Sequence, residues 1–213
     1  MRRTRIKICG LTRGEDVDAC VECGVDAIGI VLVRGSPRFV DVDQAAALRA
    51  RVPAFVQVVA LLMDPERTWV EQVLEGVQPD LLQFHGRETA DFCVSWGRGY
   101  VKAVAMRGRD GPAIQQEIDA HAQARGLLLD AHAPGGQGGS GQQFDWSRLP
   151  RLERSRLILA GGLRPDNIRD AIGRVRPVAV DLSSGVESAP GIKVKEKIID
   201  LVRQVRQADL ECA

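Results

Sequence analysis

Short apolar runs and amphipathic stretches alternate along the whole chain, and this alternation constrains the fold more than any other feature. Apolar runs without strict alternation are typical of parallel strands that helices cover on the outside. The expected strands are 5–9, 26–33, 54–63, 81–84, 100–105, 126–130, 156–160 and 178–182. Eight βα units in 213 residues, or about 27 residues each, predict a closed (βα)8 TIM barrel of the α/β class, with residues 1–213 forming a single domain.

Several helix starts can be read from the sequence. Thr12 and Glu15 form a capping-box pattern for a helix that stops near Gly24, and Asp64-Pro65 has the pattern of an N-cap followed by the first helical position. Further helices are expected over 41–51, 88–96, 112–124 and 193–207, with another beginning near Pro165. The glycine-rich stretch 133–141 interrupts the rhythm after the sixth strand and predicts a functional loop.

Charge and composition exclude several classes of function. Lys and Arg number 29 against 28 Asp and Glu, so the net charge is +1, which argues against a nucleic-acid partner. No apolar run approaches the ~20 residues that span a bilayer, so no membrane partner is expected. The basic start lacks the apolar segment of a signal peptide, and five cysteines are an odd count, so we expect a cytoplasmic protein without a disulfide framework. A monomer is the default, and a homodimer is left open.

Chemically useful residues follow several of the expected strands. In a TIM barrel the active site lies at the carboxyl ends of the strands. Cys9, His85 and Asp130 stand at such ends, and glycine turns follow the seventh strand (161–162) and the eighth (183–185). Small residues let backbone amides approach phosphate oxygens, so these turns favour a phosphate site over two ordinary turns.

Each candidate residue has a plainer interpretation beside its functional one. Cys9 is either a reactive thiol or a small buried apolar residue. Asp130 follows an apolar strand and is either an acid with a raised pKa or a loop ligand. Arg38 could bind a substrate carboxylate, but solvated loop arginines are more common. Lys7 shares a strand face with Cys9, and if that face is the barrel interior, Asp181 is its natural partner.

The remaining cysteine and histidine patterns point to packing. Cys20 and Cys23 have a Cys-x-x-Cys spacing, but they fall inside a helix and lack a second pair, so a core or surface role is favoured. His85, His121 and His132 are too scattered for a convincing metal site. We therefore expect no bound metal.

Taken together, the motifs resemble a known family. They are Lys-Ile-Cys-Gly-Leu-Thr at 7–12, Ser-Pro-Arg-Phe-Val at 36–40, Leu-Gln-Phe-His-Gly at 82–86, Leu-Asp at 129–130, Phe-Asp-Trp at 144–146, Leu-Ala-Gly-Gly-Leu at 159–163 and Val-Asp-Leu-Ser-Ser-Gly-Val-Glu at 180–187. The chain resembles the phosphoribosylanthranilate isomerases of tryptophan biosynthesis. The motifs stand in the family's order and cover nearly the whole chain.

The resemblance implies a cofactor-independent Amadori rearrangement of N-(5-phosphoribosyl)anthranilate. It implies that Asp130 is the general acid and Cys9 the general base, and that Arg38 holds the anthranilate carboxylate. The expected substrate-binding residues of the two turns are Gly161, Gly162, Asp181, Ser183, Ser184 and Gly185. For this chemistry the carboxyl pKa should be raised and the thiol pKa lowered.

The sequence departs from the family pattern in two places. Lys193-Val194 stands where a Lys-Asp pair often leads into the last helix, which puts a cap or ion pair there in doubt. The third strand ends at 60–64 without the usual aromatic run, so the pocket wall is expected to differ locally.

Two alternatives to the isomerase stay open at this point. A lyase similar to indole-glycerol-phosphate synthase would need a catalytic lysine and glutamate on pocket-facing strand ends. A non-catalytic phosphosugar-binding barrel would not require Cys9 and Asp130 together. The sequence also does not decide whether a second, histidine-pathway substrate is accepted.

Overall fold

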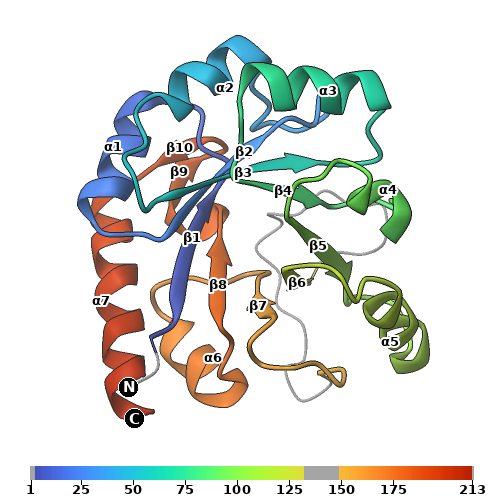
Figure 1. The fold of residues 1–213 in the computed structure, drawn as a ribbon. Coiled ribbons are helices and arrows are strands. Elements are labelled where there is room, and N and C mark those ends of the chain that lie inside the picture. The colour runs from blue at the N-terminus through green and yellow to red at the C-terminus, as the bar shows by residue number, and fades with distance from the viewer. Residues whose placement is uncertain (1–2, 132–148, 213) are drawn as a thin grey trace.

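The computed structural model describes residues 3–131 and 149–212, and its centre is a closed barrel of eight parallel strands in chain order (Figure 1). The predicted TIM barrel is therefore confirmed. The strands are β1 (Arg5–Cys9), β2 (Ala27–Val31), β3 (Gln57–Leu62), β4 (Leu81–Phe84), β5 (Tyr100–Ala105), β6 (Gly126–Asp130), β7 (Leu157–Leu159) and β8 (Ala179–Leu182). Pairing of β1 with β8 closes the barrel and sets Lys7 directly beside Asp181 in the register.

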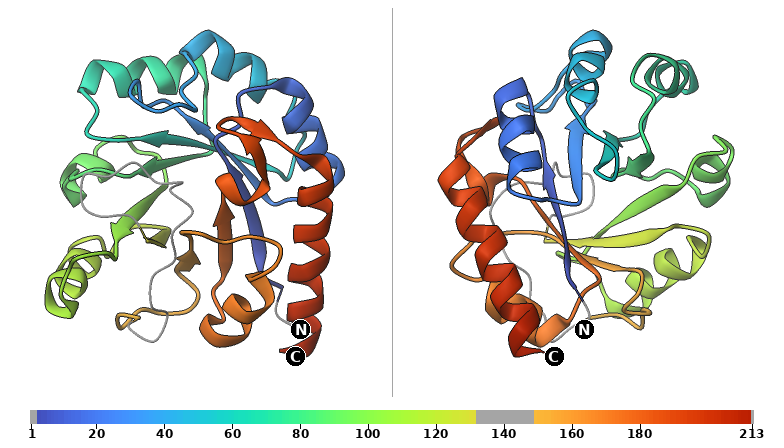
Figure 2. Two further views of the ribbon diagram at one scale, coloured as in Figure 1. Left: turned by 180° about the vertical axis from the view of Figure 1, so that it is seen from behind. Right: turned by 60° about the vertical axis from the view of Figure 1, so that its left-hand side comes forward.

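Helices cover the outside of the barrel (Figure 2). They are α1 (Gly14–Glu22), α2 (Val42–Arg49), α3 (Arg67–Gly76), α4 (Ala90–Val94), α5 (Gly111–Ala120), α6 (Ile168–Val175) and α7 (Lys195–Glu211). Between β8 and α7 the chain forms a 3₁₀ turn, η2 (Ser184–Val186), and an antiparallel hairpin of β9 (Glu187–Ala189) and β10 (Ile192–Lys193). The expected loop at 133–141 and the motif at 144–146 lie outside the described residues.

Two of the predicted helix starts are wrong. The Thr12 hydroxyl donates to the Gly191 carbonyl oxygen at 2.7 Å instead of capping α1, which begins without a side-chain cap. Asp64 has a left-handed backbone, and its carboxylate accepts from the Arg87 amide at 2.6 Å, so it caps no helix. In both cases a partner distant in sequence takes the side chain that the local pattern assigned to a helix.

The apolar core is divided between two layers. The larger layer lies between strands and helices and is filled mainly by aliphatic side chains such as Ile8, Ile28 and Leu127. A small second cluster, with Val101 and Leu128 among its members, lies on alternate strand positions. Successive strand residues point to opposite faces of the wall, so alternate positions are left for the polar residues described below.

The described residues include no helix that is both long and apolar enough to cross a membrane.

Candidate active site

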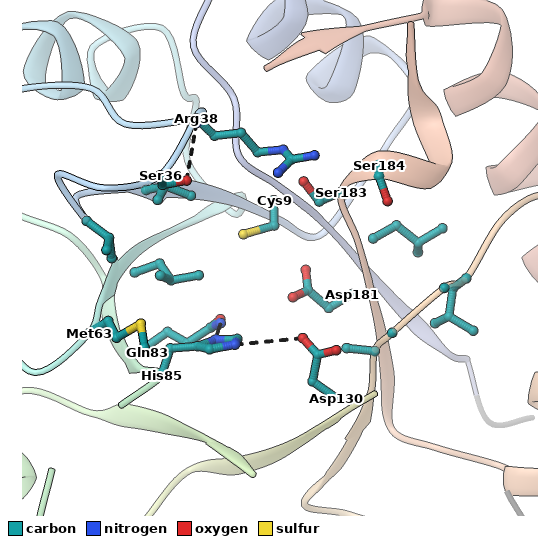
Figure 3. A pocket seen from close by; sticks show the side chains of 18 residues that line it. Cys9, Ser36, Arg38, Met63, Gln83, His85, Asp130, Asp181, Ser183 and Ser184 are labelled. Atoms are coloured by element: carbon teal, nitrogen blue, oxygen red, sulfur yellow. Dashed lines mark hydrogen bonds and ion pairs between the residues drawn. The ribbon is translucent and has the colours of Figure 1, made fainter. Parts of the chain in front are cut away.

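A pocket opens at the carboxyl ends of the strands (Figure 3). About 740 Å³ of empty space lies in the pocket and its open mouth together. The predicted site residues that line it are Cys9, Arg38, Asp130, Gly161, Gly162, Asp181, Ser183 and Ser184. Gly185 is not among the lining residues and contributes in another way, described below.

Cys9 is the last residue of β1 and is almost completely buried. A Cβ atom on Gly29 of β2 would lie only 2.7 Å from the Cys9 Sγ, so the thiol fits against a position that needs glycine. Burial raises the pKa of the Cys9 thiol, and the neighbouring Lys7 ammonium offsets this only in part. The expected lowering of the thiol pKa is therefore wrong, because the loss of water around the sulfur outweighs the nearby cation.

Lys7 and Asp181 form an ion pair inside the barrel, as predicted. The Lys7 Nζ lies 2.9 Å from Asp181 Oδ1, and both side chains are buried. Burial opposes the charge on Lys7, but Asp181 and Cys9 outweigh that effect and raise its pKa. Burial also raises the pKa of Asp181, against the opposing influence of Lys7. The thiol therefore sits beside an ammonium that stays protonated.

Asp130 ends β6 and faces the pocket across from β4. Its Oδ2 lies 3.8 Å from the Nε2 of His85, as the dashed line in Figure 3 shows. The other ring nitrogen of His85 lies 3.5 Å from the amide nitrogen of Gln83. His85 was noted at a strand end but received no role from the sequence. The structure places its ring where it can contact the carboxyl group of Asp130.

Arg38 is neither solvated nor without a protein partner. Its Nε donates to Glu187 Oε1 at 2.9 Å and its Nη2 donates to Glu187 Oε2 at 2.6 Å. Both side chains are buried, with the Arg38 side chain 9% exposed and that of Glu187 4%. Burial opposes ionisation of Glu187, but the hydrogen bonds from Arg38 and the charge of Lys193 hold its pKa below the usual value. Sequence reasoning missed Glu187, although it ends the last matching motif.

The glycine turn after β7 and the glycine turn after β8 contact each other at one side of the pocket. Gly161 and Gly162 both have left-handed backbones, with φ of 82° and 62°. A Cβ atom on Gly185 would lie 2.0 Å from the Leu163 carbonyl oxygen, so the turn after β8 packs directly against the turn after β7. The contact needs glycine at position 185. It brings the two turns together on one side of the pocket, where Ser183 also lies.

The departure at Lys193-Val194 affects the cap and not the ion pair. Val194 occupies the N-cap position of α7 and provides no side-chain hydrogen bond. The Lys193 Nζ nevertheless lies 2.6 Å from Glu187 Oε1 and donates to the Cys9 carbonyl oxygen at 2.6 Å. The doubt about the cap is confirmed, while the ion pair forms with a residue of the β9 strand.

Cys20, Cys23 and His121 lie outside the pocket. Cys20 is a buried free thiol and Cys23 a partly exposed one, both on the helix side of the barrel. His121 contacts the Tyr100 hydroxyl at 3.3 Å, and His132 is outside the described residues. Over 3–131 and 149–212, no three His, Cys, Asp or Glu residues are grouped so that they could hold a metal ion.

Residues 6–204 match the family model described as N-(5'phosphoribosyl)anthranilate (PRA) isomerase. The chain belongs to this family. A phosphoribosylanthranilate isomerase of Halorhodospira halophila is 48% identical over 207 residues, covering 97% of this chain and 99% of the relative. The isomerase activity expected from the sequence is confirmed by this membership, and it favours the isomerase over the lyase and the non-catalytic barrel.

Solved structures of the same family have the same fold. The phosphoribosylanthranilate isomerase of Thermotoga maritima superposes with a TM-score of 0.83 at 34% identity, over 96% of this chain and 99% of that one. Another family structure is a complex with reduced 1-(o-carboxyphenylamino)-1-deoxyribulose 5-phosphate, with a TM-score of 0.79, 31% identity and coverage of 96% and 99%.

Proposed function

We propose that Asp130 and Cys9 carry the two proton transfers that convert N-(5-phosphoribosyl)anthranilate into 1-(2-carboxyphenylamino)-1-deoxyribulose 5-phosphate. The observation that carries this proposal is the order of groups around one pocket. The carboxyl group ends β6, the thiol ends β1, and the glycine turns follow the two strands between them, β7 and β8. A phosphosugar anchored at the turns would have an acid on one side and a base on the other.

In the first step, Asp130 in its protonated form gives its proton to the ribose ring oxygen. The C1′–O bond breaks, and the electron pair of the anthranilate nitrogen forms the C=N bond of a protonated Schiff base. Asp130 becomes a carboxylate in this step, and the nearby ring of His85 is placed to stabilise that charge. General acid catalysis of this kind typically contributes ~10²–10⁴-fold.

In the second step, the Cys9 thiolate removes the proton from C2′. The electrons of the C–H bond move to form a C1′=C2′ double bond, and the nitrogen of the Schiff base becomes neutral. The resulting enolamine tautomerises to the ketone product. The burial that raises the thiol pKa makes the thiolate a stronger base once it forms, and the Lys7 ammonium beside it stabilises its charge.

Binding groups hold the substrate across these two residues. The turns containing Gly161, Gly162, Ser183 and Ser184 hold the phosphate, and Arg38 holds the ring carboxylate. The analogue in the solved family complex carries both a phosphate and a ring carboxylate in its name, which supports two anionic ends for the ligand of this pocket. Fixing the ribose between them can supply several kcal/mol of the barrier reduction.

The lyase alternative finds no support in the pocket. It calls for a lysine available for chemistry at a strand end, and both lysines of the barrel strands are in ion pairs, Lys7 with Asp181 at 2.9 Å and Lys102 with Glu88 at 3.2 Å.

An assay with substrate generated in situ tests the two catalytic roles. The loss of anthranilate-type fluorescence is followed for the wild type and for Cys9→Ala and Asp130→Ala. Each variant should lose ~10²-fold or more in kcat while still binding the reduced product analogue with near-normal affinity. Near-normal turnover by both variants would remove Cys9 and Asp130 from these roles.

We also propose that residues 1–213 act as one domain, as a monomer, in the cytoplasm. The five cysteines are free thiols in the structure, which fits a reducing compartment. A single cooperative unfolding transition, the mass by light scattering and cell fractionation test these three statements in turn.

A further inference from the structure

The contact between Arg38 and Glu187 uses only one edge of the guanidinium group. Glu187 accepts from Nε and Nη2, which together form the side edge. Arginine has five N–H donors in a planar fork, so the end edge, formed by Nη1 and the second N–H of Nη2, remains. Within residues 3–131 and 149–212, Nη1 makes no hydrogen bond. That edge has the geometry for a second carboxylate to bind in a bidentate manner.

Glu187 is the first residue of β9, and two other residues of the β9–β10 hairpin donate hydrogen bonds to its carboxylate. Its Oε1 accepts from the Lys193 Nζ at 2.6 Å and from the Gly191 amide at 3.1 Å. The Lys193 side chain is fully buried, so the carboxylate has little freedom to turn. Arg38 comes from the loop after β2, so this contact joins that loop to the hairpin that follows β8, and the strands β2 and β8 are the two neighbours of β1.

The charges in this group favour one more anion. Arg38 and Lys193 carry two positive charges and Glu187 carries one negative charge, which leaves a net charge of +1 on three buried side chains. A ring carboxylate on the end edge of Arg38 would bring the total to zero. Burying a charge without a partner is costly, so a ligand that lacks the carboxylate would leave this cluster uncompensated.

We propose that Glu187 is a positioning residue that presents the free edge of Arg38 to the substrate carboxylate, and that it thereby determines the preference for carboxylated phosphosugar adducts. This inference rests on the carboxylate-binding role given to Arg38 in the proposed function. Glu187 acts through Arg38 and touches no reacting atom. The β9–β10 hairpin then helps to determine which ligands bind, and it also connects β8 to α7.

The opposite role for Glu187 gives an opposite result. If Glu187 competed with the substrate carboxylate for Arg38, its removal would free the guanidinium group and leave an extra positive charge. Binding of a carboxylated ligand would then become tighter. A positioning role predicts weaker binding, because the side chain in Glu187→Gln is neutral and has an NH2 donor in place of one carboxylate oxygen, so it cannot form the bidentate pair with the side edge.

The experiment compares two ligands by calorimetry. One is reduced 1-(2-carboxyphenylamino)-1-deoxyribulose 5-phosphate, and the other is the same compound with an unsubstituted phenyl ring. The quantity measured is the ratio of their dissociation constants. A charge-assisted pair contributes enough for roughly ten- to hundredfold discrimination in the wild type. Glu187→Gln should reduce this ratio about tenfold, and KM for the natural substrate should rise while kcat changes little.

Three further variants make the result decisive. Arg38→Ala should remove the discrimination, and if it does not, the role of Arg38 in the proposed function fails and the role of Glu187, which acts through Arg38, fails with it. Glu187→Asp keeps the charge but is shorter, so it should also lower the ratio, and it serves if Glu187→Gln does not fold. Glu88→Gln, which removes a buried carboxylate paired with Lys102 at 3.2 Å, should lower the melting temperature and leave the ratio unchanged.

The proposal is also overturned by either of two other results. In the first, Arg38→Ala removes the discrimination and both Glu187 variants retain it. In the second, the ratio rises in Glu187→Gln, as competition for Arg38 would require.

Discussion

The Lys7 ammonium lies 2.9 Å from Asp181 Oδ1 inside the barrel, on the strand face that also carries the Cys9 thiol. This arrangement links three ionisable groups. Burial raises the pKa of Cys9, the charge on Lys7 lowers it and Asp181 raises it, and the net direction is upward. The thiol is thus mainly protonated near neutral pH, and the amount of thiolate depends on how well Lys7 keeps its charge beside it.

Replacing Lys7 by Met should shift the pH dependence of the reaction. The active form of Cys9 is the thiolate, so kcat/KM rises as pH increases through the thiol pKa. Removing the cation raises that pKa further, and the rising limb should move to higher pH, with at least about a tenfold loss of rate at neutral pH. The measurement is kcat/KM against pH for the wild type and Lys7→Met.

Lys102→Met provides a matched control. Lys102 is also buried and lies 3.2 Å from Glu88, but unlike Lys7 it is not among the charges that shift the pKa of Cys9. Removing one partner of a buried ion pair costs roughly 3–5 kcal/mol, so both variants should unfold at lower denaturant concentration. A pH profile that shifts in both variants, or in neither, would show that Lys7 does not act on the thiol.

Gly185→Ala should weaken binding of the phosphate end. The added Cβ would meet the Leu163 carbonyl oxygen at 2.0 Å, which is a backbone atom, so the two turns must move apart. We expect KM to rise at least about tenfold, since displacements of about 1 Å in a site cost up to ~10²-fold. Inorganic phosphate should also become a weaker competitive inhibitor.

Gly173→Ala, in α6, is the comparison for this substitution. Nothing lies within 4 Å of a Cβ placed there, and Ala is favoured over Gly in a helix by roughly 0.5–1 kcal/mol. This variant should be slightly more stable, with unchanged KM. Equal KM values for the two variants would contradict the role given to the contact between the turns.

The five thiols should react with iodoacetamide in an order set by exposure and pKa. Cys23 and Cys212 are partly exposed, whereas Cys9, Cys20 and Cys93 are buried. Burial raises the pKa of Cys20 and of Cys93 to about 12. Peptide mass spectrometry should therefore find Cys23 and Cys212 modified first. Among the buried thiols, Cys9 should react next because it lines the pocket, and its labelling should be faster as pH rises and be blocked by the reduced product analogue. Fast, pH-independent labelling of Cys9 would contradict a raised pKa.

The barrel could be predicted from the sequence because its strands are local features. Each apolar run is long enough to form a strand that the helices cover, and the runs occur at a regular spacing. The pairing of Lys7 with Asp181 was also accessible, since it follows from strand periodicity and from the closure of β8 on β1. Both inferences depend on geometry that every parallel barrel shares.

The predictions that were wrong or incomplete have a common physical cause, which is contact between residues that are distant in sequence. Thr12 was taken for a helix cap, but its hydroxyl bonds a carbonyl 179 positions away. Arg38 was expected either to bind the substrate carboxylate or to be solvated, and its protein partner, Glu187, which lies 149 positions along the chain, was missed. The thiol pKa was placed on the wrong side of its usual value because desolvation depends on packing around Cys9.

The central claim, that Asp130 opens the ring and Cys9 then removes the C2′ proton, is tested most directly by a kinetic isotope effect. The substrate is prepared with deuterium at C2′, and kcat is compared with that of the protiated compound in each variant. Cys9→Ser slows the C–H step, so the isotope effect should exceed that of the wild type. Asp130→Asn slows ring opening, so it should fall towards unity. The reverse pattern, or the same isotope effect in both variants, would contradict the assignment of the two residues.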